Sequence, residues 1–171
     1  MKIQKMTFLG CLFLFVFGLQ ISAQQTTIWL VRHAEKDTAA ATKSDPPLSS
    51  VGVQRVKDLR SYLLAEKIDN VFSTETKRTR ATASAVDAPL LIYGTGNFID
   101  FANVLMPEFK GKKILIVGHS NTILETIEAL GAKRPVKELK DEDYDYIFKL
   151  TISDAGKVKV DVAHYGAVHR S

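Results

Sequence analysis

Cysteine is nearly absent from this chain of 171 residues, and the single one, Cys11, lies close to the amino terminus. A disulfide framework and a cysteine-rich metal site are therefore excluded. Lys and Arg outnumber Asp and Glu by only 23 to 19 and form no block, so the charge pattern indicates no nucleic-acid partner. The four histidines, among them His164 and His169, lack the spacing of zinc ligands, and we expect neither a metal nor another cofactor.

Long apolar runs are also missing, except at the amino terminus. Two lysines precede an uncharged run over residues 6–19, and Ala23 then offers a small residue at a cleavage point. This pattern predicts a signal peptide of a bacterial kind at 1–23 and a mature chain, 24–171, that is exported to the periplasm or secreted. The mature chain would contain no cysteine. A retained membrane anchor is the alternative, but the run is shorter than the roughly 20 residues that span a bilayer. We therefore expect no stable membrane association after cleavage.

Short apolar strands alternate with amphipathic helices along the mature chain, whose length suits one domain. This alternation predicts an α/β three-layer sandwich, with a mostly parallel sheet, helices on both faces and antiparallel pairing only in a final hairpin. Ser49 or Ser50 is expected to cap the first helix. The expected strands are 26–31, 70–73, 90–93 and 113–117, the helices 51–67, 74–88, 98–109 and 122–130, and the hairpin 146–152 with 158–162.

Polar side chains follow three of the expected parallel strands. Arg32 and His33 end the first, Ser73 leads toward Arg78 after the second, and a Gly-His-Ser run that contains His119 ends the fourth. Because the carboxyl ends of parallel strands lie on one edge of the sheet, these residues are expected to converge on one pocket. Arginine offers a planar fork for phosphate oxygens, and a neutral imidazole can act as a nucleophile. Each residue alone is as well explained by a solvated strand end or turn, but three such ends together favour phosphate chemistry.

Four segments together resemble the histidine phosphatase superfamily, the phosphoglycerate mutase-like group of proteins. They follow the order of the family's motifs and cover most of the mature chain. The family's first motif usually has Gly where this chain has Ala34. The segments are Arg32-His33-Ala34-Glu35-Lys36, Leu48-Ser49-Ser50-Val51-Gly52, Phe72-Ser73-Thr74-Glu75-Thr76-Lys77-Arg78-Thr79-Arg80-Ala81-Thr82 and Val117-Gly118-His119-Ser120-Asn121-Thr122.

The resemblance implies a metal-independent phosphomonoester hydrolase that forms a phosphohistidine on His33. Arg32, Arg78 and His119 would line the pocket and stabilise charge on the transferring phosphoryl group. The arginines would also keep His33 neutral, since a nearby positive charge lowers the pKa of an imidazole. Arg80 competes with Arg78 for the second-arginine role, but the segment aligns better at Arg78.

Two further residues, Lys36 and Asn121, are candidates for a second line of phosphate contacts, or else solvated loop residues. The substrate is then expected to be a phosphorylated small molecule.

The general acid is the point at which the sequence departs from the family. Mutases of the family carry a Glu that has no match here, and the acid phosphatase branch has Asp where this chain has Ser120. Asp100 is the best-placed candidate, in the region after the third strand, and Glu108 and Glu35 are the others; each is equally well read as a solvated carboxylate. Hydrolysis is therefore favoured over mutase activity. The alternatives are a non-catalytic phospholigand-binding module and a protein-phosphohistidine phosphatase.

Overall fold

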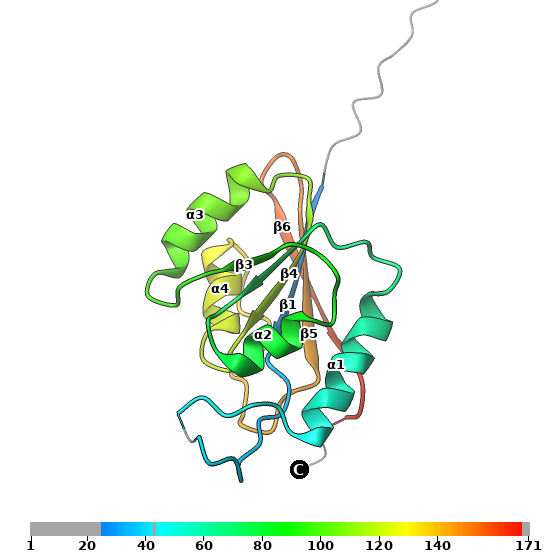
Figure 1. Cartoon of the computed structure of the whole chain (residues 1–171). Helices are drawn as coiled ribbons and strands as arrows, with labels where there is room; N and C mark the ends of the chain where they lie inside the picture. Colours follow the sequence, from blue (N-terminus) through cyan, green and yellow to red (C-terminus); the bar gives the residue numbers. More distant parts are fainter. Residues whose placement is uncertain (1–24, 43, 169–171) are drawn as a thin grey trace, which may run out of the picture.

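The computed structural model describes residues 25–42 and 44–168, so the predicted signal peptide and His169 lie outside the described residues. A six-stranded sheet in the order β3-β2-β4-β1-β5-β6 runs through the centre of the molecule (Figure 1). The strands are β1 (Thr26–Arg32), β2 (Asn70–Ser73), β3 (Leu90–Ile92), β4 (Lys113–Gly118), β5 (Tyr146–Ile152) and β6 (Val158–His164). The helices are α1 (Ser50–Leu63), α2 (Lys77–Ala83), α3 (Phe98–Glu108) and α4 (Ile123–Ala129).

Strand pairing follows the predicted mixture of directions. β3, β2, β4 and β1 pair in parallel, whereas β5 pairs antiparallel with both β1 and β6. The predicted α/β class and mostly parallel sheet are confirmed, and the final two strands form the expected hairpin. Gly156, with φ of +73°, supplies the left-handed residue that its tight turn requires.

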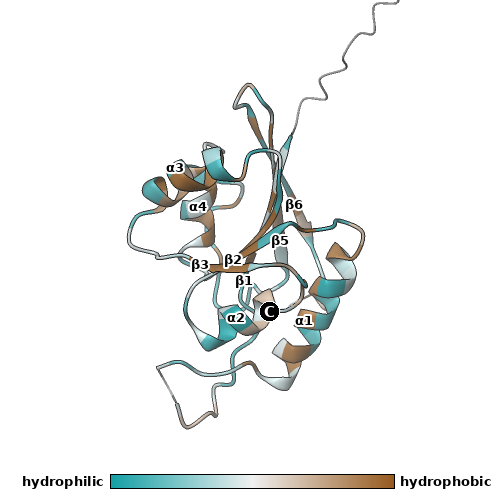
Figure 2. Ribbon diagram, turned by 45° about the horizontal axis from the view of Figure 1, so that its top comes forward, coloured by the Kyte–Doolittle hydropathy of each residue, from teal (hydrophilic) through white to brown (hydrophobic). Residues whose placement is uncertain are grey.

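Helices cover both faces of the sheet and complete three layers. The side chains of β1 alternate between the two faces of the sheet, and because both faces are covered, the strand is buried along its whole length. Ile28 and Leu30 pack with α3 and α4 on one face, whereas Trp29 and Val31 pack with α1 and α2 on the other. The central strands are accordingly hydrophobic (Figure 2), and their rigid core fixes the strand ends at which the polar residues lie.

Two helices are shorter than the sequence pattern predicts. α1 begins after its cap Ser49, whose hydroxyl accepts from the Gly52 N–H, and it ends at Leu63 rather than near Lys67. Lys67 has φ of +49°, which an α-helix cannot include. α2 is capped by Thr76 and begins at Lys77, and i→i+3 hydrogen bonds tighten the chain at its end, so it spans Lys77–Ala83 rather than the predicted 74–88.

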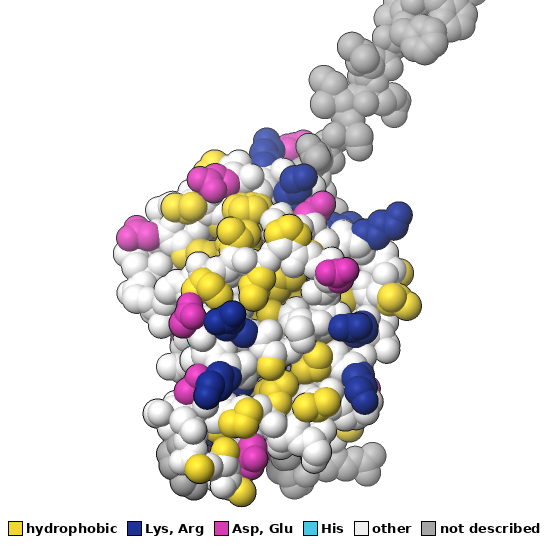
Figure 3. Space-filling view, viewed as in Figure 1, with side chains coloured by type: hydrophobic (Ala, Val, Ile, Leu, Met, Phe, Trp, Pro, Cys, Tyr) yellow, Lys and Arg dark blue, Asp and Glu magenta, His cyan; other side chains and the backbone are white. Residues whose placement is uncertain are grey.

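β3 is an exposed edge strand, and apolar side chains gather on this side of the molecule (Figure 3). They include all three residues of β3 together with Ile99 and Val104 of α3. Across the part of the chain that the structure describes, no helix combines the length and apolar character needed to cross a bilayer.

Candidate active site

The register of the parallel strands brings the predicted polar residues to one edge of the sheet. Arg32 of β1 lies opposite Gly118 of β4, and Ser73 of β2 lies opposite Val117. The His33 N–H donates to the Gly118 carbonyl at 2.9 Å, which extends the pairing by one residue past β1. The chain ends that carry Arg32-His33 and His119 are therefore neighbours, as the sequence predicts.

Position 118 has no room for a side chain, so glycine is required there. A Cβ on Gly118 would come within 2.7 Å of the Thr122 hydroxyl and 2.8 Å of the Tyr93 hydroxyl. The close approach lets Thr122 Oγ1 accept from the His119 N–H at 2.8 Å. This bond fixes the backbone that carries His119 directly after the strand.

His33 is held as the tautomer that a nucleophile needs. Its Nδ1 lies 2.8 Å from the Ala34 carbonyl oxygen, and because a carbonyl only accepts, Nδ1 must carry the proton. Nε2 then keeps its lone pair, and no hydrogen bond from the described residues engages it. The ring is almost fully buried and lies edge-on to that of His119, with a centroid separation of 5.3 Å.

His119 takes the opposite tautomer. Nδ1 lies 3.5 Å from the Arg78 guanidinium, which only donates, so Nε2 carries the proton and donates to Thr74 Oγ1 at 2.9 Å. Thr74 in turn donates to Thr79 Oγ1 at 2.9 Å, because the Thr79 hydroxyl is itself committed to backbone carbonyls. Threonines at the end of β2 and in α2 thus orient the second histidine.

Arg32 is fixed by the segment that precedes β5. Its NH1 donates to the carbonyls of Lys140 and Asp141 at 2.7 and 3.0 Å, and its guanidinium stacks on the Tyr144 ring at 4.1 Å from the centroid. NH2 also donates to the Tyr144 hydroxyl at 3.4 Å, and these contacts together fix the orientation of the planar guanidinium. Tyr144 also lies near the nucleophile, with its ring centroid 6.0 Å from that of His33.

Arg78 lies beside His119, and Arg80 lies on the surface. The Arg78 side chain is 17% exposed, contacts His119, and pairs through NH1 with Asp45 at 3.3 Å. The Arg80 side chain is 54% exposed and pairs with Glu75 on the surface. The geometry therefore favours the alignment that assigns the second-arginine role to Arg78.

Arg32 and Arg78 each have a buried N–H donor without a partner among the described residues. The donor is Nε in both side chains. Buried donors are normally paired, and a guanidinium N–H is best satisfied by an anionic oxygen. Two such donors beside His33 and His119 fit a phosphoryl group.

Burial and positive charge keep both histidines neutral. Burial is the main cause that lowers the pKa of His33 to about 3, with Arg32, Arg78 and His119 adding to it against the bond to Ala34. Burial, followed by Arg78 and Arg32, lowers the pKa of His119 to about 4. The imidazole of His33 is therefore a free base at neutral pH.

This neutrality can be measured directly. In the free protein the Cε1–H resonances of His33 and His119 should not titrate between pH 8 and 5, whereas both should titrate near 6.5 in the urea-unfolded chain. Since the unfolded state then binds more protons below pH 6.5, these histidines should lower the free energy of unfolding as the pH falls from 6.5 toward 4. A midpoint between pH 5.5 and 7 for either folded-state resonance would contradict the assignment.

The other predicted site residues lie outside this cluster. Lys36 is exposed and bridges to Leu48, and Asn121 is exposed at the start of the turn before α4. Glu35 is bound to Arg55, with Oε1 at 2.8 Å from Nε and 2.7 Å from NH2. Neither Lys36 nor Asn121 has a contact with the pocket residues that would fix it on a phosphate.

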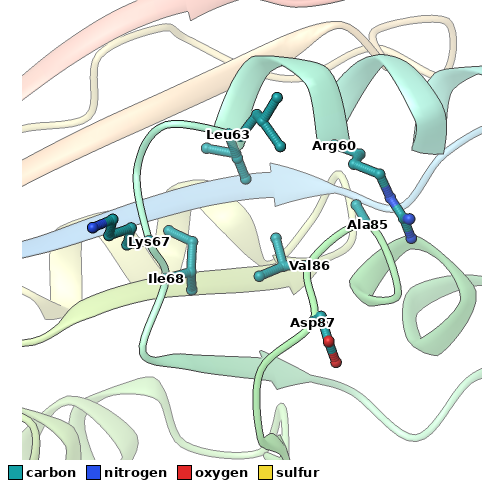
Figure 4. A pocket seen from close by; sticks show the side chains of 8 residues that line it. Arg60, Leu63, Lys67, Ile68, Ala85, Val86 and Asp87 are labelled. Atoms are coloured by element: carbon teal, nitrogen blue, oxygen red, sulfur yellow. The ribbon is translucent and has the colours of Figure 1, made fainter.

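Asp100 and Glu108 line a separate cavity of about 460 Å³ between β3 and α3. Its walls contain none of the residues Arg32, His33, Arg78 and His119. The Asp100 carboxylate accepts from Asn97 Nδ2 at 2.7 Å and is exposed. A second cavity, of about 290 Å³, lies between α1 and the chain that follows α2 and is likewise separate (Figure 4). The role of Asp100 as the acid thus remains a prediction.

Tyr144, Thr74, Asp45 and Arg55 are structural partners that sequence reasoning missed. Tyr144 reaches Arg32 across 112 positions of the chain, so no local pattern could find it. Thr74 is the exception, because a hydroxyl directly after a strand end that points to the pocket is a visible signal. In the described part of the chain, no three His, Cys, Asp or Glu side chains gather so as to hold a metal ion.

Comparison with known proteins agrees with this geometry. The protein-family model described as "Histidine phosphatase superfamily (branch 1)" matches residues 28–92. These residues include His33 and Arg78, and the match confirms the resemblance predicted from the motifs. A search of curated proteins by sequence gave no significant match.

Solved structures share the fold at low sequence identity. The protein histidine phosphatase SixA complexed with tungstate has a TM-score of 0.66 and 16% identity, with 81% of this chain and 96% of that chain covered. The alpha-ribazole phosphatase from Shigella flexneri gives 0.63 and 15%, with 81% and 96% covered. The phosphoserine phosphatase from Entamoeba histolytica, in complex with 3-phosphoglyceric acid, gives 0.59 and 16%, with 84% and 98% covered. These likenesses confirm the fold.

Proposed function

We propose that this chain, whose family match and fold are those of the histidine phosphatase superfamily, hydrolyses phosphomonoesters through a phosphohistidine at His33. One observation carries the proposal. His33 is a buried neutral imidazole with Nδ1–H committed to the Ala34 carbonyl, so Nε2 is left free beside two arginines and a second neutral histidine.

The reaction follows from these positions in two displacements. Nε2 attacks the phosphorus, and the P–N bond forms as the P–O bond to the leaving group breaks. The leaving oxygen takes its proton from the general acid, for which Asp100 is the candidate, or from solvent water. Arg32 and Arg78 donate to the non-bridging oxygens, on which negative charge must be stabilised, and His119 lines the site beside Arg78. Water then attacks the phosphohistidine, which releases orthophosphate and returns the neutral imidazole.

Release of orthophosphate from nitrophenyl phosphate tests the proposal. Purified 24–171 should release phosphate with many turnovers per chain, in the presence of chelator as in its absence. A protein that binds orthophosphate at this pocket but gives no turnover would instead support the alternative of a phospholigand-binding module.

Asp100→Asn tests the general acid. An alkoxide leaving group needs a proton, whereas nitrophenolate hardly does, so loss of a positioned acid should slow alkyl phosphates by about 10²-fold and leave nitrophenyl phosphate nearly unchanged. The measurement is kcat/KM for a series of phosphates with leaving groups of different pKa. Asn97→Ala, which removes the Asp100 partner together with the N-cap of α3 but keeps the Asp100 carboxyl, is the control for disturbance of this helix end. If Asp100→Asn leaves every substrate unaffected, Asp100 is a surface carboxylate.

A second candidate, hydrolysis of phosphoramidates such as protein phosphohistidine, is favoured by the state of the carboxylates near the pocket. Glu35 is paired with Arg55, and Asp45 accepts from Arg78 and from the Lys77 N–H, so both carboxylates are already engaged by other donors. A phosphoramidate requires less help from a protein acid than an alkyl ester. Faster release from phosphoramidate than from alkyl phosphates by the parent would identify this class.

The proposal also includes export of the enzyme. The charged and then apolar pattern of residues 1–23 supports a cleaved signal peptide, and hence a periplasmic or secreted phosphatase acting on phosphorylated small molecules. Export disfavours phosphorelay proteins as substrates, because these are cytoplasmic. Amino-terminal sequencing of the expressed protein should give Gln24 as the first residue.

A further inference from the structure

Arg55 is a buried arginine outside the phosphate pocket, on the inner face of α1, and it joins two distant segments. Its Nε and NH2 bind Glu35 Oε1 at 2.8 and 2.7 Å. Its NH1 and NH2 also donate to the carbonyls of Tyr165 and Ala167, each at 3.1 Å. The side chain is only 4% exposed, so its charge is fully committed to these partners.

The carboxyl-terminal partner, residues 165–168, is built to lie against α1, and we call it the strap. The ring of Tyr165 is buried, and its N–H donates to the Asp145 carbonyl at 2.9 Å. Gly166 has φ of +68°, and a Cβ there would come within 2.6 Å of the Asp58 carboxylate. Only glycine fits this position, which places the two carbonyls where the Arg55 fork reaches both.

The amino-terminal partner is the catalytic loop, residues 33–36. The Ala34 carbonyl in this loop fixes the tautomer of His33, and the Ala34 N–H donates to Thr82 Oγ1 at 2.9 Å. The next residue, Glu35, is tied at its carbonyl by the Ser49 N–H and at its carboxylate by Arg55. Within the described residues no other side chain bonds to that carboxylate, so Arg55 sets where the buried end of the loop lies.

We propose that the strap, acting through Arg55 and Glu35, holds the catalytic loop so that the Ala34 carbonyl stays on His33 Nδ1, which makes Arg55 a positioning residue for phosphoryl transfer. This rests on the proposed function. Arg55 touches neither the phosphoryl group nor His33. Its loss should therefore reduce the rate of the chemical step and spare the binding of phosphate by Arg32 and Arg78.

Arg55→Gln and Arg55→Lys test the inference, with Arg60→Gln as the matched control. Arg60 lies on the same helix but is exposed and donates only to the Ser84 carbonyl. Misplacement of a catalytic group by about 1 Å can cost 10²-fold, so Arg55→Gln should lower kcat for nitrophenyl phosphate 10- to 100-fold. The inhibition constant of orthophosphate should change less than threefold. Arg55→Lys should recover only part of kcat, because one ammonium cannot span both partners, and Arg60→Gln should match the parent.

A second readout does not depend on turnover. Long-range ¹H–¹⁵N spectra of the parent should show His33 protonated at Nδ1 alone, and Arg55→Gln should show both tautomers. Gly166→Ala should move the strap off α1 while Arg55 and Glu35 remain, and it should give the same mixture with a smaller loss of kcat. It also serves as the test if Arg55→Gln does not fold.

Unchanged kcat with an unchanged His33 spectrum in these variants would overturn the inference. So would a parallel loss of kcat and of orthophosphate binding. A parent without turnover would overturn the proposed function alone, because the tautomer and orthophosphate measurements would still decide the role of Arg55.

Discussion

Replacement of His33 by Ala should abolish turnover and leave the fold intact. The side chain lies at the end of β1, and the backbone bond from residue 33 to the Gly118 carbonyl does not depend on it. Without Nε2 no group in the pocket can accept the phosphoryl group, because His119 directs its protonated Nε2 toward Thr74 and its Nδ1 toward Arg78. We expect a fall of at least 10⁴-fold in kcat, the scale seen when a covalent nucleophile is removed.

The measurement that assigns the nucleophile is labelling of the chain by a radioactive phosphate ester. The parent, quenched within a turnover, should carry acid-labile and base-stable label on His33, and His33→Ala should carry none. His119→Ala is the control, because it should slow labelling without moving it to another residue. Equal labelling of His33→Ala and the parent would show that the phosphoryl group is carried elsewhere.

Much of the site could be predicted because its residues belong to the ends of parallel strands. A buried β-branched run that stops at Arg32-His33, and another that stops at Gly118-His119, can lie only at one edge of a parallel sheet, and the observed register pairs Arg32 with Gly118. The orientation of His33 was not foreseeable, since it depends on the carbonyl of the residue that follows it. A local sequence pattern predicts the strand or helix to which a residue belongs, but it does not predict the backbone conformation of the loop that follows.

The partners of the pocket residues could not be predicted, because they come from segments without regular structure. Tyr144 and the carbonyls that hold Arg32 belong to the chain between α4 and β5, and Asp45 belongs to the loop before α1. Sequence periodicity says nothing of such segments. The predicted lengths of α1 and α2 were wrong for a related reason. The left-handed conformation of Lys67 and the cap at Thr76 depend on tertiary packing, which the sequence pattern does not report.

Arg78→Ala should have the second largest effect, a loss of about a hundredfold or more in kcat/KM. Its Nε is buried without a partner among the described residues and its NH2 lies beside His119, and guanidinium donors to a phosphoryl group contribute on the order of a few kcal/mol to the transition state. Arg78→Lys should recover little, because an ammonium cannot reproduce the planar fork. The measurement is kcat/KM for nitrophenyl phosphate beside the inhibition constant of orthophosphate, both of which should weaken.

Arg80→Ala is the matched control for Arg78→Ala. Arg80 lies two residues further along the same helix and pairs with Glu75 at the surface, so its loss should change kcat/KM less than twofold. The Asp45 contact needs a control of its own, since Arg78→Ala also frees that carboxylate. Asp45→Asn should keep most of the activity if Arg78 acts on phosphate, whereas a loss as large as that of Arg78→Ala would mean that the arginine serves to hold the loop. A larger loss for Arg80→Ala than for Arg78→Ala would show that the second arginine had been assigned to the wrong face of α2.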